Sequence, residues 1–202
     1  MSLRSPPAEF SSLSTIPHTR LDIRYGTTDN FMGRPISGYG ALGAWFRAEG
    51  VEQLRKLALG LEKQGLGIII WDAYRPRRAT LEMVQWAKET GQKWLLEEGY
   101  LVYRSRHNAG GAVDLNFYDL QTGIAMDMGT EWDHFSEASH VHHAEGQILE
   151  NRLFLQQMMR QAGFSGYETE WWHFELPDAT SFPLRDVPYG ADEADEDSSI
   201  CE

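Results

Sequence analysis

The chain has 202 residues, 42% of them hydrophobic, which is enough for one domain with a full core but short for two. Its 30 acidic and 18 basic side chains give a net charge of -12, which argues against a nucleic-acid partner or an anionic membrane surface. Cys201 is the only cysteine, so a disulfide within one chain and a cysteine-ligated metal site are excluded. Residues 1–14 lack the apolar core of a signal peptide and no run reaches transmembrane length, so we expect a cytoplasmic protein.

The first two predicted elements are a helix and the strand that follows it. The helix is indicated by apolar residues at helical spacing, namely Val51, Leu54, Leu57, Ala58 and Leu61. Gly65 ends this helix, and the β-branched, apolar run Gly67–Tyr74 predicts a strand. Pro76 stops the strand, because proline cannot donate a hydrogen bond to a neighbouring strand. Since the run is apolar throughout, we expect both faces of the strand to be buried.

Two more helices and two more strands are predicted further along the chain. A helix over Arg77–Glu89 has Leu81 and Val84, with Trp86 or Ala87, on its apolar face. The strands are Ala112–Tyr118 and Glu170–Leu176, and a last helix covers Gly146–Ala162. This pattern predicts a single α+β domain over residues 1–190. The acidic residues that follow have no apolar partners, so we expect residues 191–202 to form a disordered tail.

A histidine and an aspartate around the second predicted strand have the character of metal ligands. His107 lies in a glycine-rich approach to the strand, and Asp114 lies inside it between apolar neighbours. A buried carboxylate must be paired, hydrogen-bonded or bound to a metal, because burying it without compensation is costly. Taken alone, the two residues are equally compatible with a turn histidine and an aspartate that caps backbone amides.

The segment Glu170-Trp171-Trp172-His173 favours the metal interpretation, because it surrounds a histidine and a glutamate with large apolar groups. On an ideal strand residues 170 and 173 point to opposite faces, so we expect Glu170 at the strand's start or beside a bulge. The alternative is a core strand with incidental polar residues. Two histidines, one ligating carboxylate and one spare carboxylate are what a catalytic zinc ion needs: three ligands, an open fourth position and a base.

Five motifs that follow one another along the chain give it a family resemblance. They are Tyr25–Gly33, Trp71–Pro76, Ser105–Asp114, Met128–Asp133 and Glu170–His173. With these motifs in this order, the chain resembles the D-Ala-D-Ala dipeptidases, zinc enzymes related to the DD-carboxypeptidases and, in fold, to the Hedgehog signalling domain. The resemblance implies a mainly antiparallel central sheet flanked by helices and one Zn²⁺ per chain.

The resemblance also implies roles for residues at the reaction centre. Glu170 is expected to be the catalytic base. Arg75 is expected to face the scissile carbonyl and stabilise the oxyanion, with Asp72 holding its guanidinium in position. The alternative for Arg75 is a surface charge at the end of a strand. The zinc ligands implied by the resemblance are His107, Asp114 and His173.

The substrate implied by the resemblance is a small zwitterionic dipeptide, so the pocket must bind an ammonium group and a carboxylate. Asp133 is the candidate for the ammonium group, and Tyr25 and Ser105 are expected to line the pocket. The alternatives are a DD-carboxypeptidase acting on peptidoglycan stem peptides and a non-catalytic, zinc-stabilised binding module. Arg106 and Ala109 depart from the usual family pattern, so the identity of the preferred dipeptide stays open. The sequence does not determine the oligomeric state or the biological role.

One histidine-rich stretch, His140–His143, has two interpretations. Alternating imidazoles can form a second metal site. The simpler interpretation is an exposed loop near the active site in which His140 contributes a hydrogen bond, and we assign no metal ligand to this stretch.

Overall fold

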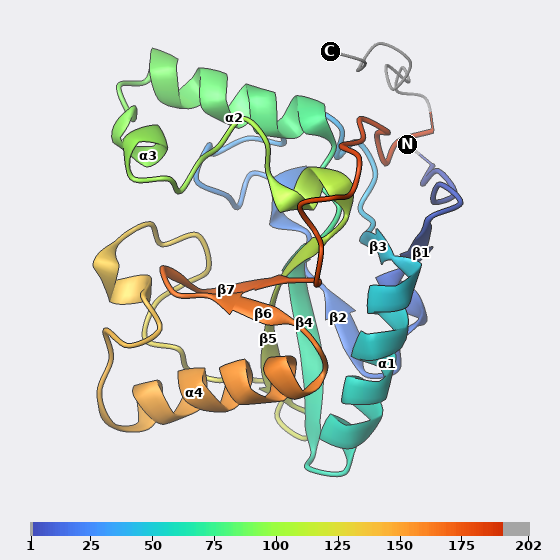
Figure 1. Cartoon of the computed structure of the whole chain (residues 1–202), viewed down its shortest axis with the longest axis vertical. Helices are drawn as coiled ribbons and strands as arrows, with labels where there is room; N and C mark the ends of the chain where they lie inside the picture. The colour runs from blue at the N-terminus through green and yellow to red at the C-terminus, as the bar shows by residue number, and fades with distance from the viewer. Residues whose placement is uncertain (1, 192–202) are drawn as a thin grey trace.

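The structure, a computed structural model, describes residues 2–191 and has a five-stranded sheet at its centre (Figure 1). The strands, in spatial order, are β2 (Thr19–Leu21), β4 (Leu66–Asp72), β5 (Ala112–Asp119), β7 (Glu170–Glu175) and β6 (Ser165–Tyr167). The pair β2 and β4 is parallel, and the other three pairs are antiparallel. This confirms the predicted α+β fold with a mainly antiparallel sheet. The predicted tail lies outside the described residues, apart from residue 191.

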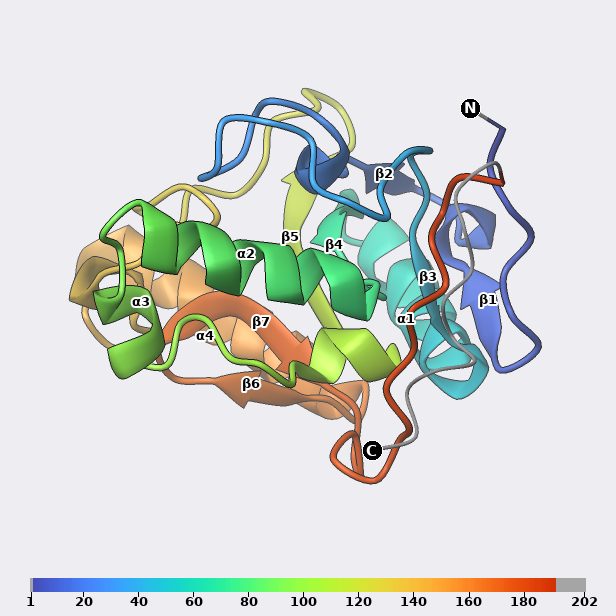
Figure 2. The same cartoon turned by 90° about the horizontal axis from the view of Figure 1, so that it is seen from above.

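Helices surround the sheet (Figures 1 and 2). Helix α1 (Ala48–Glu62) packs on β4, and α4 (Gly146–Gln161) packs on β6 and β7. Helix α2 (Arg77–Glu89) lies across the end of the sheet at which β4 finishes. Within residues 2–191, no helix combines the length and apolar character needed to cross a bilayer. The smaller elements are β1 (Phe10–Ser12), β3 (Trp45–Arg47), α3 (Trp94–Glu97), η1 (Leu13–Thr15), η2 (Arg24–Gly26), η3 (Arg106–Ala109) and η4 (Glu137–Ser139).

The elements form where apolar residues can be buried together. All five apolar residues that predicted α1 are buried, and β4 is buried on both faces as expected. Strand β4 ends at Asp72 rather than Tyr74, because the chain then leaves the sheet to pair elsewhere. The amide of Tyr74 donates to the carbonyl of Trp45, and the amide of Arg75 donates to the carbonyl of His107.

The apolar face predicted for α2 is partly wrong. Val84 and Ala87 are buried, but Leu81 is 41% exposed. At about 100° per residue, Leu81 lies on the opposite side of the helix from most of the buried positions. The side that faces the sheet includes the small and polar residues Ala79 and Thr80, which a search for large apolar residues overlooks.

A buried arginine joins α4 to the long segment that precedes it. Arg152 is 1% exposed, and its guanidinium donates to the carbonyls of Met128, Ala138 and His140 at 2.8, 2.8 and 2.7 Å. Backbone dipoles therefore solvate this charge in place of a carboxylate. The contacts hold the segment 128–140, which carries Asp133, against α4.

Candidate metal centre

The register of the sheet brings two of the predicted ligands together. Asp114 on β5 is the direct partner of His173 on β7. Directly opposite residues of an antiparallel pair project from the same face of the sheet, so these two side chains lie next to each other. On the other side of β5, Asp72 at the end of β4 is also paired with Asp114. Asp72, Asp114 and His173 thus lie at one level of the sheet.

The third predicted ligand is held by a capped turn. His107 lies in η3, whose N-cap residue Ser105 accepts a hydrogen bond from the His107 amide at 3.2 Å. The side-chain oxygen of Asn108 accepts a hydrogen bond from the Ser105 amide and so completes a capping box. Gly110 ends the turn with φ of 65°, a left-handed conformation that glycine adopts without strain. The backbone that carries the imidazole is therefore fixed at both ends.

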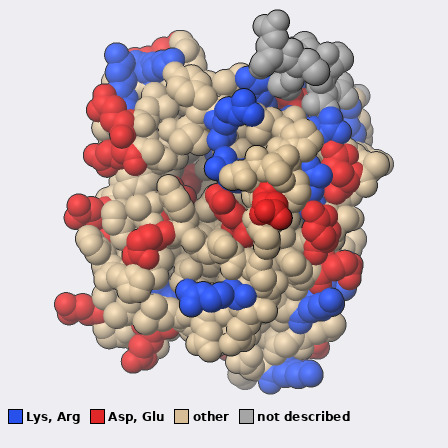
Figure 3. Space-filling model, viewed as in Figure 1, with Lys and Arg blue, Asp and Glu red and all other residues tan. Residues whose placement is uncertain are grey.

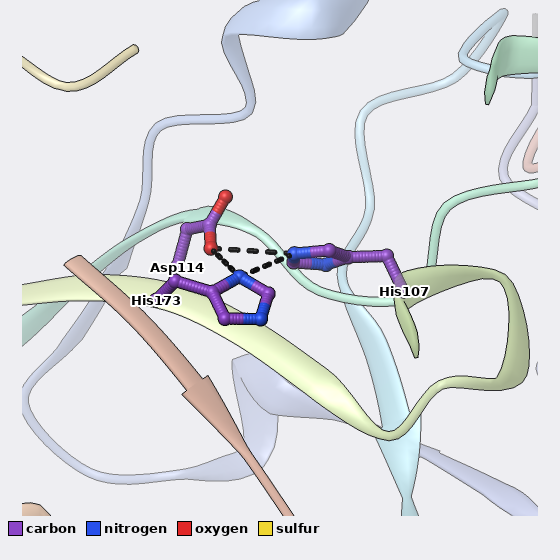
Figure 4. A group of neighbouring side chains, drawn as sticks. All are labelled: His107, Asp114 and His173. Carbon is purple, nitrogen blue, oxygen red and sulfur yellow. Dashed lines mark hydrogen bonds and ion pairs between the residues drawn. The ribbon is translucent and has the colours of Figure 1, made fainter. Parts of the chain in front are cut away.

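The three side chains converge on one point (Figure 4). His107 Nε2 lies 3.2 Å from His173 Nδ1, and Asp114 Oδ1 lies 3.3 Å from the first nitrogen and 3.0 Å from the second. Tetrahedral zinc with bonds of about 2.0–2.1 Å separates its ligand atoms by about 3.3 Å. In the described part of the chain, no other three His, Cys, Asp or Glu side chains gather closely enough to hold a metal.

Each ligand is also held from behind. His107 Nδ1 lies 2.7 Å from the carbonyl of Ala73, and His173 Nε2 lies 3.2 Å from Glu175 Oε1. With the outer nitrogens acting as donors, the inner nitrogen of each ring can supply a lone pair to a metal ion. The indole of Trp132 donates to Asp114 Oδ2 at 3.2 Å. The inner nitrogens of His107 and His173 and the buried carboxylate of Asp114 face one another, and this arrangement fits a bound cation.

Glu170 lies beside this centre at the start of β7. The pairing of β6 with β7 shifts register between Gly166 and Tyr167, at the end of β6 nearest to Glu170. Glu170 Oε2 therefore comes within 4.0 Å of His173 Nδ1, although the two residues are three positions apart. Burial, aided by the nearby Asp114, raises the pKa of Glu170 to about 7, and His173 opposes this shift. A cation held by the ligands would favour the ionised carboxylate and lower this pKa.

Arg75 is buried rather than exposed at a strand end. It is 8% exposed, and both its Nε and its Nη2 lie 2.9 Å from Asp72 Oδ2. The other oxygen of Asp72 accepts a hydrogen bond from the Tyr39 hydroxyl at 2.5 Å. The guanidinium carbon lies 5.0 Å from the centre of the Tyr25 ring. The structure thus fixes the orientation of Arg75 at the edge of the metal centre.

The three candidates for substrate contact line one cleft with the metal ligands. Its volume is about 320 Å³, near the lower limit for small-molecule sites. The Tyr25 hydroxyl donates to Asp133 Oδ2 at 2.7 Å. Burial raises the pKa of Asp133 well above its usual range, although the Tyr25 bond acts in the opposite direction. Ser105 also lines the cleft, and its hydroxyl caps the turn that carries His107.

The histidine-rich stretch does not join this centre. His140 Nε2 lies 3.3 Å from the Tyr100 hydroxyl, as expected for a hydrogen-bonding role. His142 and His143 are exposed, and each faces a separate acid, at 2.8 Å for Glu168 and 3.9 Å for Glu137. The rings of His140 and His143 lie 5.1 Å apart, but among the described residues this stretch offers no three side chains close enough to hold a metal.

Two supporting residues were not identified from the sequence. Glu175 lies two positions after His173, so the period of a strand puts both on one face, and this signal was available. Trp132 lies 18 residues after Asp114, outside any helix or strand, and only the folded structure reveals its contact with Asp114.

Known proteins similar to the chain point to the same chemistry. A family model described as D-ala-D-ala dipeptidase, of peptidase family M15, matches residues 8–190. A D-alanyl-D-alanine dipeptidase of Enterococcus faecium is 36% identical over 200 residues, covering 89% of this chain and 93% of the relative. A protein of the same name from Escherichia coli K12 is 32% identical, covering 89% of this chain and 91% of the relative. One from Streptomyces coelicolor is 35% identical, covering 78% of this chain and 85% of the relative.

The ligand geometry and the family match agree. His107, Asp114 and His173 form the zinc site of a metallopeptidase. The chain belongs to the D-Ala-D-Ala dipeptidase family of peptidase family M15.

Proposed function

We propose that the enzyme hydrolyses D-Ala-D-Ala to two molecules of D-alanine. The observation that carries this proposal is the placement of an unligated carboxylate, Glu170, 4.0 Å from a metal ligand in a small cleft. The curated relatives named D-alanyl-D-alanine dipeptidase support the choice of substrate.

The chemistry divides between the ion and the side chains around it. When bound, zinc polarises the scissile carbonyl and lowers the pKa of a water molecule. The carboxylate of Glu170 accepts a proton from the attacking water and returns it to the amine of the leaving D-alanine. One water and one peptide bond are consumed, and two amino acids are released.

Arg75 stabilises the charge that develops on the carbonyl oxygen. Its bonds to Asp72 fix the guanidinium, so little reorganisation is needed when the oxyanion forms. Asp133 binds the substrate ammonium group, and the Tyr25 hydroxyl holds the Asp133 carboxylate in place. Ser105 lines the cleft. A small substrate offers little remote binding energy, so capturing both of its charged ends gives specificity.

The two alternatives are less well supported. A purely structural zinc site closes its fourth position with protein and needs no adjacent carboxylate, whereas this centre has three protein ligands beside Glu170. A DD-carboxypeptidase acts on long stem peptides, whereas the relatives are named as dipeptidases.

The test is an assay of D-alanine release from D-Ala-D-Ala, L-Ala-L-Ala and a stem pentapeptide. We expect turnover of the first substrate alone. Glu170→Gln should lower kcat by about 10²- to 10⁴-fold, because the base is lost, while the zinc content stays unchanged. Full activity in this variant would rule out Glu170 as the base, and preferred cleavage of the pentapeptide would reassign the substrate.

The remaining predictions concern partners and location. That nucleic acid and membranes are not partners stays a prediction from the net charge, and the face shown in Figure 3 carries both acidic and basic side chains. A cytoplasmic location stays a prediction from the sequence, and cell fractionation tests it.

A further inference from the structure

Arg106 is a cation in the active-site cleft that the proposed mechanism does not use. It is the first residue of η3, directly before the ligand His107, and it lines the cleft. Its side chain is 40% exposed, but its Nε atom is buried and makes no hydrogen bond. The nearest acid is Glu175, whose Oε2 lies 4.0 Å from Nε and therefore beyond hydrogen-bond distance. A partly buried guanidinium with unused donors suits an anionic ligand.

The substrate of the proposed function has one charge that still lacks a partner. Asp133 accounts for the ammonium group, whereas the carboxylate lies beyond the scissile bond on the leaving residue. A carboxylate that enters a cleft without a partner loses hydration and is bound poorly. The substrate therefore requires hydrogen-bond donors in the cleft, and a cation supplies the strongest ones.

Three arginines line the cleft, and they differ in availability. Arg75 is bound to Asp72 through two nitrogens, so it is committed. Arg104 is exposed, and ordering its long side chain would cost entropy. Arg106 is half-buried on a turn that the capping box fixes. We infer that Arg106 binds the C-terminal carboxylate of the substrate and makes the enzyme select peptides with a free carboxylate at the leaving residue. This inference rests on the proposed function.

The surroundings of Arg106 suit this role. Planar guanidinium and carboxylate groups can form two parallel hydrogen bonds, which fix orientation as well as charge. Glu175 approaches Arg106 with one oxygen while its other oxygen accepts from His173. Because the contact between Arg106 and Glu175 is too long for a hydrogen bond, the guanidinium can turn to an incoming carboxylate without breaking one. Arg106 thereby acts on substrate preference and not on the metal ligands.

The experiment compares D-Ala-D-Ala with its C-terminal amide, which lacks the carboxylate charge. In the wild type, kcat/KM should favour the acid by about 10- to 100-fold, the range expected for charged hydrogen bonds. Arg106→Ala should remove this preference by raising KM for the acid, with kcat/KM for the amide unchanged. Arg104→Ala is the matched control on the same cleft and should keep the wild-type ratio. Zinc content should be equal in all three proteins.

Two results would overturn the inference. One is an equal loss on both substrates in Arg106→Ala, which would mean that the residue acts through His107 or Glu175. The other is a wild type that cleaves D-Ala-D-Ala and its amide equally well, which would leave the proposed function standing. If the wild type does not cleave the dipeptide, the proposed function fails, and calorimetric binding of the acid and the amide to wild type and Arg106→Ala decides the inference separately.

Discussion

His107 and His173 lie buried beside Asp114, whereas His142 and His143 lie exposed in the loop before α4. Both pairs have carboxylates within reach. In the buried pair the outer nitrogen of each ring is held by a carbonyl or a carboxylate, and the inner nitrogens face each other at 3.2 Å. In the exposed pair each ring faces its own acid.

The difference shows what makes a metal site from histidines. Closeness in sequence gives the exposed loop more imidazoles in a shorter stretch, yet nothing aims them at one point. The buried centre draws its ligands from η3, β5 and β7, and a fixed backbone and a hydrogen bond orient each ring. Convergence and outer contacts, rather than the number of histidines, determine metal binding.

The largest expected effect comes from removing one histidine of the buried centre, compared with removing both histidines of the exposed pair. His107→Ala should lose its zinc and release D-alanine about 1000-fold more slowly or worse, because several kcal/mol of transition-state stabilisation disappear. The double variant His142→Ala, His143→Ala should keep its zinc content and stay within about twofold of wild-type activity. Metal analysis and an assay of released D-alanine check both. Zinc retained by the first variant, or lost by the second, would contradict the comparison.

A smaller effect is expected from the carboxylates that hold the rings. Glu175 lies 3.2 Å from His173, and Glu168 lies 2.8 Å from His142, so the two form a matched pair. Glu175→Gln should weaken zinc binding by about tenfold, because the acceptor behind a ligand loses its charge. Glu168→Gln should leave zinc affinity unchanged. Titration against a competing chelator measures both, and equal affinities for the two variants would show that the outer contact is unimportant.

The smallest effect is the contribution of the exposed histidine pair to stability, measured against that of the zinc centre. Zinc at about 1000 times its Kd should add about 4 kcal/mol to the free energy of unfolding, which raises Tm by about 10 °C for a chain of this size. The exposed pair of His142 and Glu168 should contribute less than about 1 kcal/mol. Scanning calorimetry of the wild type with zinc or with a chelator, beside Glu168→Gln, makes the measurement. His107→Ala should show no zinc-dependent shift, and a shift there would place the bound ion elsewhere.

The sequence identified the centre because its residue types were incompatible with their surroundings. Asp114 and His173 lie among large apolar residues, and such positions need a physical reason for polar groups. Strand periodicity puts residues 170 and 173 on opposite faces, so an irregularity near Glu170 was also predictable. The register shift beside Glu170 in the structure fits this prediction. Contacts between distant segments were not predictable, such as the bond from Trp132 to Asp114 or from Tyr39 to Asp72. These depend on tertiary packing that no local pattern encodes, whereas Leu81 was misplaced because a search for large apolar residues overlooks the buried Ala79 and Thr80.

Arg152 gives the substrate cleft an unexpected dependence on the outer helix. The guanidinium ties α4 to the carbonyls of Met128, Ala138 and His140, on either side of Asp133. If α4 separated from the sheet, the buried charge would lose these acceptors, and the carbonyls would lose their donor. We therefore expect segment 128–140 and α4 to open together as one cooperative unit, so that Asp133, the residue proposed to bind the ammonium group, shares the protection against hydrogen exchange of a helix that does not line the cleft.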